Sequence, residues 1–88
     1  MKIKDGYMLR SIAGYSVVVP IGDSTLDFNG VINLNETGTT LWKALENDAT
    51  EEDLVKALLA EYDVDNERAL TDVRSFVKKM LEAGLIEY

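Results

Sequence analysis

The pattern of residue types changes abruptly after Leu34, and this change constrains the fold more than any other feature of the sequence. Residues 7–21 and 31–34 favour extended structure, whereas the rest of the chain consists of three amphipathic segments, each preceded by a helix-capping residue. Strands followed by helices, with no linker between them, are typical of α+β domains. We therefore predict a three-stranded antiparallel sheet followed by three helices, compatible with a winged-helix-like arrangement.

The strand-forming part is rich in β-branched and aromatic residues. Within residues 7–21 we expect two antiparallel strands joined by a tight reversal at Ala13-Gly14. Pro20 removes a ladder donor, which indicates a strand end or an edge. A loop begins at Gly22, and the pair Asn29-Gly30 then leads into a short third strand over residues 31–34.

Three helix starts and one helix stop follow. Asn35 and Asp65 can cap the first and third helices, and Thr50 can cap the second, which opens with three acids that suit the positive end of a helix dipole. The third helix runs to about residue 83. Gly84 suits the left-handed position after it, and Leu85 the apolar position of a Schellman stop, so we expect the last helix to close in this way.

Apolar stripes at helical spacing define the expected core. We assign Trp42, which shares a stripe with Leu41 and Leu45, to the core. On the third helix the stripe spans about 140°, at 100° per residue, which is wide enough to serve two surfaces. Its members are Ala69, Leu70, Val73, Phe76, Val77, Met80 and Leu81.

The composition limits both size and chemistry. Eighty-eight residues with 47% apolar content suit a single domain, residues 1–88, with one modest core. The chain has no cysteine and no histidine, so it lacks disulfides, thiolate metal sites and the commonest general base. We expect no catalytic site, no cofactor and no metal. With no signal peptide and no apolar run long enough to span a membrane, we expect a cytoplasmic protein.

One acidic segment resembles the opening of a calcium loop but does not complete it. Asp63, Asp65 and Glu67 alternate as such ligands do, yet Arg68 stands where the turn requires glycine and Arg74 where the last carboxylate belongs. Calcium binding is therefore rejected. The sequence around Ser24 faintly resembles the attachment site of an acyl carrier protein, but it follows strands instead of opening a helix, so carrier function ranks third.

The ordered motifs from residue 31 onward resemble the PqqD family. The strand ends in Leu34-Asn35-Glu36-Thr37-Gly38; a tryptophan-bearing helix, a threonine-led helix, Asp72-Val73 in the third helix and a terminal Gly-Leu-Ile follow in order. The resemblance covers nearly the whole chain. It implies a domain that recognises the leader of a ribosomally made, post-translationally modified peptide (RiPP), without catalysing a reaction itself.

The resemblance also implies a binding mode and a set of site residues. In that family the leader adds as a strand to the third strand and lies in a groove against the third helix. The implied docking edge is Gly30, Val31, Ile32, Asn33 and Leu34, and the implied groove wall is Leu70, Val73, Arg74, Phe76, Val77 and Met80. A basic stripe on the same helix, Arg74, Lys78 and Lys79, can receive acidic leader side chains. The sequence does not decide which flank of the helix faces the groove.

The partners implied by the resemblance are a precursor leader peptide and a separate maturase. Members of the family typically serve a radical SAM enzyme, but the sequence leaves the type of maturase open. It also leaves the oligomeric state open.

The alternative function, from another class, is that of a winged-helix DNA-binding regulator. Charge argues against it, because residues 45–67 hold nine acids and only one base, Lys56. This segment carries −8, whereas the rest of the chain sums to +1. We expect neither nucleic acid nor membrane as a partner.

Overall fold

A computed structural model describes residues 1–22 and 32–87. Two strands, β2 (Tyr7–Ile12) and β3 (Tyr15–Pro20), form a hairpin, and β4 (Ile32–Leu34) pairs with β3 to complete an antiparallel sheet of order β2-β3-β4. Three helices follow: α1 (Glu36–Leu45), α2 (Glu51–Glu61) and α3 (Asn66–Glu82). The predicted α+β architecture, three strands followed by three helices, is confirmed.

The hairpin turns as the sequence predicts. Ile12 pairs with Tyr15, so Ala13 and Gly14 alone make the connection, with φ of 53° and 83°. Both values lie in the left-handed region that a two-residue turn between twisted strands requires. Pro20 is the last residue of β3, where its missing N–H costs no internal ladder bond. The expected loop beyond Gly22 and the Asn29-Gly30 pair lie outside the described residues.

The capping residues start and stop the helices as expected. Asn35, Thr50 and Asp65 each accept a hydrogen bond from the backbone N–H three residues ahead. At the end of α3, Gly84 has φ of 77°, and the N–H of Leu85 donates to the carbonyl of Met80 at 3.0 Å. This bond defines the Schellman stop and turns the chain back toward the core.

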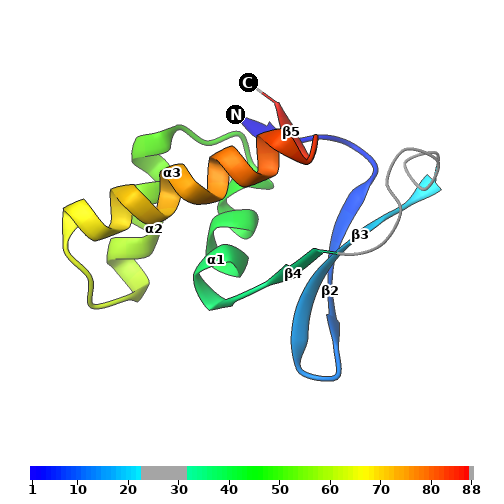
Figure 1. Ribbon diagram of the computed structural model, residues 1–88, viewed down its shortest axis with the longest axis horizontal. Coiled ribbons are helices and arrows are strands. Elements are labelled where there is room, and N and C mark those ends of the chain that lie inside the picture. Colours follow the sequence, from blue (N-terminus) through cyan, green and yellow to red (C-terminus); the bar gives the residue numbers. More distant parts are fainter. Residues whose placement is uncertain (23–31, 88) are drawn as a thin grey trace.

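A second, two-stranded sheet was not predicted from the sequence. It joins β1 (Lys2–Ile3) to β5 (Ile86–Glu87) in antiparallel register, so the two ends of the chain lie side by side (Figure 1). The turn at Gly84 makes the pairing possible, because it directs residues 86–87 back toward β1. Each strand has two residues, too few to produce a recognisable pattern.

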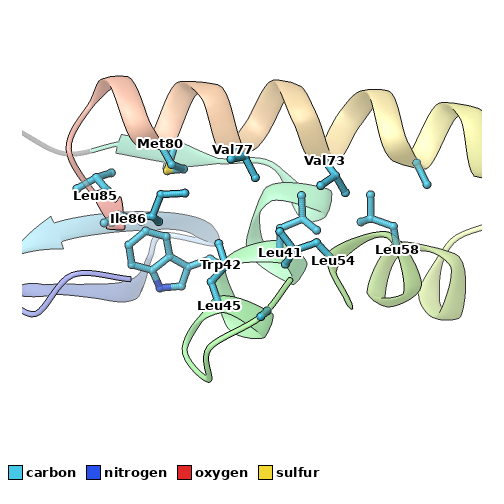
Figure 2. Packing of buried hydrophobic residues seen from close by; sticks show 13 residues of the cluster. Leu41, Trp42, Leu45, Leu54, Leu58, Val73, Val77, Met80, Leu85 and Ile86 are labelled. Atoms are coloured by element: carbon cyan, nitrogen blue, oxygen red, sulfur yellow. The ribbon is translucent and has the colours of Figure 1, made fainter. Parts of the chain in front are cut away.

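The core lies between α3 and the layer formed by α1 and α2 (Figure 2). Trp42, predicted to be a core residue, is only 1% exposed and packs with Leu41 and Leu45 from the same helix. The inner face of the sheet contributes Val18, which is fully buried. From α3 the core receives Ala69, Val73, Val77 and Met80. None of the helices in the described part of the chain is long and apolar enough to cross a membrane.

Candidate functional site

The outer edge of β4 is the first element of the candidate site. β4 is the end strand of its sheet, and its inner edge is occupied by β3 through the pairs Ser16–Leu34, Val17–Asn33 and Val18–Ile32. No other strand within residues 1–22 and 32–87 pairs with the outer edge. The backbone N–H and C=O groups directed outward from β4 are therefore available to an added strand.

A groove of about 780 Å³ lies between this edge and α3. One wall is formed by β4 and the first turns of α1, and the other by residues of α3 spaced at three- and four-residue intervals. Such spacing places the α3 residues on a single face of the helix. The lining is Asn33, Leu34, Asn35, Thr37, Gly38, Leu41, Arg68, Asp72, Ser75, Phe76, Lys79 and Met80.

The groove is apolar at its base and polar at its rim. Leu41 and Met80 are almost fully buried, with Leu34 and Phe76 half-buried beside them. The exposed side chain of Lys79 lies at the rim, and Arg68 pairs there with Asp72 at 3.4 Å. An apolar base can accept apolar side chains, while polar groups around it restrict which peptides fit.

A tight junction between β4 and α1 shapes one end of the groove. The Oδ1 atom of Asn35 accepts hydrogen bonds from the N–H of Gly38 at 2.8 Å and from the hydroxyl of Thr37 at 3.1 Å. A Cβ atom on Gly38 would lie 3.0 Å from that oxygen and 3.5 Å from Leu34. A side chain at this position would press on the oxygen that caps α1, which gives the Leu-Asn-x-Thr-Gly motif a structural reason. The same residues also line the groove.

The structure brings some of the predicted site residues to the groove. Asn33, Leu34, Phe76 and Met80 line it, and Ile32 belongs to the same strand. Two members of the predicted docking edge, Gly30 and Val31, lie outside the described residues.

Other predicted wall residues lie elsewhere on α3. Val73 and Val77 are buried in the core beneath the groove, and half-buried Leu70 does not line it. Arg74 faces α2, where its guanidinium lies 3.4 Å from the carboxylate of Glu51. The flank of α3 that faces the groove is thus the one on which Phe76 lies.

Three groove residues of α3 were missed, namely Arg68, Asp72 and Ser75, whereas Lys79 was predicted as part of the basic stripe. All three are polar, so a search for apolar stripes passes over them. The signal was nevertheless present, because steps of four residues back from Phe76 lead to Asp72 and then to Arg68. Choosing that flank over the opposite one required knowing what α3 packs against.

The residue types of the groove can be compared with those of catalytic and metal sites. The chain has no histidine or cysteine, and within the described residues no group of three or more acidic side chains is placed to hold a metal ion. Asp72, the acid of the lining, is paired with Arg68. A free strand edge beside a part-apolar groove can instead take an extended peptide, pairing with its backbone and accepting alternate side chains.

These features define a class of small domains that can bind a peptide as an added strand. The sequence matches the family described as "Coenzyme PQQ synthesis protein D (PqqD)" over residues 16–86. The chain therefore belongs to the PqqD family, as the resemblance predicted. No match is found among curated proteins.

Two solved structures are similar to this chain. The structure titled "TbiB1 in Complex with the TbiA(beta) Leader Peptide" has 28% sequence identity and a TM-score of 0.79, with 99% of this chain and 95% of that one covered. "Lasso peptide synthetase B1 complexed with the leader peptide" has 20% identity and a TM-score of 0.74, covering 96% and 93%. The second agrees with this chain in fold.

Proposed function

We propose that this protein is a RiPP recognition element: it binds the leader of a ribosomally made precursor peptide and presents it to a separate maturase, without itself making or breaking a covalent bond. The observation that carries the proposal is the free edge of β4 beside the groove of α3. Membership of the PqqD family and the 28% identity to a protein solved with a leader peptide support it. Residues 1–88 act together as one peptide-binding domain.

The leader binds as a strand on β4, with alternate side chains directed into the groove. The proposed contact residues are Ile32, Asn33 and Leu34 on the edge, together with Phe76 and Met80 in the base. The predicted residues Gly30 and Val31 lie outside the described part of the chain. Backbone pairing supplies affinity for any extended peptide, and the groove supplies selectivity. The maturase, which is a radical SAM enzyme or another peptide-modifying enzyme, acts on the core peptide that the leader carries.

DNA binding has no observation in its favour. The groove-facing flank of α3 presents Arg68, already paired with Asp72, and Lys79, whereas a DNA-reading helix requires several free cations facing phosphates. The acidic segment of residues 45–67 includes the whole of α2, which packs against α3.

Affinity capture followed by titration tests the function. The domain, used as bait in extract of the native cells, should recover a short precursor peptide, identified by mass spectrometry. A synthetic copy of its leader should then bind in calorimetric titration. Phe76→Ala should weaken binding about fivefold or more, because it removes the half-buried aromatic of the groove base.

The matched control is Leu70→Ala, which truncates another half-buried side chain of α3 that does not line the groove. It should leave affinity within about twofold, a difference below 0.5 kcal/mol. Thermal unfolding of both variants separates loss of binding from loss of fold. Recovery of no precursor, or equal weakening by both variants, would contradict the proposal.

A further inference from the structure

The basic residues of α3 do not form one surface. Arg74 is directed to α2 by its ion pair with Glu51, and Lys78 does not line the groove. Lys79 does line it. Of the three cations predicted as a stripe, the fold therefore presents one to a bound peptide.

The charge of Lys79 is uncompensated in the described part of the protein. At the other end of the groove, Arg68 is paired with Asp72 on the next turn at 3.4 Å. Lys79 forms no ion pair with residues 1–22 or 32–87. The charged lining, with two cations and one acid, thus carries +1 on a chain of net charge −7. This local sign favours an acidic group on the ligand.

The position of Lys79 relative to the apolar base sets the spacing expected between an acidic and an apolar residue of the bound peptide. Lys79 follows Phe76 by three residues and precedes Met80, so it lies roughly 4.5 Å further along the helix axis than Phe76. In an extended peptide, side chains two residues apart point to the same face and are separated by roughly 6.6 Å. The flexible stem of lysine spans the difference.

We infer that the groove selects extended peptides in which an acidic residue stands two positions from an apolar residue: the apolar side chain enters the base at Phe76 and Met80, and the carboxylate pairs with Lys79. This inference rests on the proposed peptide-binding function and specifies its ligand. Lys79 is a specificity residue, because backbone pairing on β4 is indifferent to side-chain charge.

A display library of short random peptides, selected separately on three proteins, tests the inference. Wild-type protein should enrich Asp or Glu two positions from an apolar residue. Lys79→Glu should replace that preference with Lys or Arg. Lys78→Glu makes the same change of charge at the neighbouring position, outside the groove, and should keep the wild-type preference.

Affinities of individual enriched peptides complete the test. Changing the acid to lysine should weaken binding to wild type about three- to tenfold, and Lys79→Glu should restore it. The difference should shrink as salt is added, since the pair lies at the rim.

The outcomes separate the inference from the function on which it rests. The inference would be overturned if wild-type protein enriched peptides with an apolar residue but showed no preference for an acidic one. It would also be overturned if Lys79→Glu left the acidic preference unchanged. Either result would leave the peptide-binding function standing. Proteins that enrich no peptide would overturn both.

Discussion

N-methylation of the leader backbone separates strand addition from other modes of peptide binding. In strand addition, alternate residues of the peptide direct their N–H groups toward β4, and the residues between them direct theirs away. A methyl group on an amide that pairs with β4 removes a donor and obstructs close approach. A methyl group on an intervening amide leaves the pairing intact. We therefore expect sensitivity to follow a period of two residues.

The structure sets how many peptide amides should be sensitive to methylation, and general hydrogen-bond energies set how much affinity each one should lose. The lining of α3 extends from Arg68 to Met80, an axial rise of roughly 18 Å, which matches about five residues of an extended peptide. β4 as described has three residues, of which one or two direct their backbone groups outward. One or two peptide amides should therefore pair with Ile32–Leu34. Each lost bond costs about 0.5 to 1.5 kcal/mol, or about two- to twelvefold in affinity.

The assay is calorimetric titration of leader peptides methylated at one amide at a time, once the leader is identified by capture. Methylation at a position bonded to β4 should weaken binding by that amount, and its two neighbours should show little change. A uniform profile would refute strand addition even if the peptide binds. Sensitivity at three- and four-residue spacing would indicate a bound helix instead.

Three further predictions concern local structures that support the site. Ala13→Asn should raise the free energy of unfolding by about 0.5 to 1 kcal/mol, because alanine is held at φ of 53°, where asparagine is better tolerated; an unchanged urea midpoint would contradict the assigned turn. Asn35→Ala should lower the free energy of unfolding by about 1 kcal/mol by removing the cap of α1, and unaltered thermal stability would show that the cap contributes nothing. Hydrogen bonds from the backbone and hydroxyl of Thr50 lower the pKa of Asp53 below its ordinary value of 3.8. The carboxylate therefore stabilises the fold above that pH and loses its effect as the pH falls through the lowered value, so the stability advantage of wild type over Asp53→Asn should diminish in acid. An advantage independent of pH between neutral and strongly acidic buffer would count against the capping box.

Most of the fold could be predicted because its signals are local. Asn35, Thr50 and Asp65 cap helices through bonds to residues three positions ahead, and Gly84 ends α3 through bonds within a single turn. Such contacts depend on short segments and are visible in sequence. The pairing of Lys2 with Glu87 depends instead on bringing the two ends of the chain together, and neither two-residue strand has a periodicity that reveals it.

The site could be predicted only in part for a related reason. The sequence determined that α3 carries an apolar stripe wider than one surface needs, and the order of its motifs determined the family. The apolar stripe alone does not determine how α3 is rotated about its axis relative to the rest of the fold. Packing against α1 and α2 buries Val73 and Val77, draws Arg74 to Glu51, and leaves Phe76 and Lys79 facing β4. Only this packing decides which side chains a bound peptide meets, because the energy that orients a helix comes from the surfaces it covers and not from its own sequence.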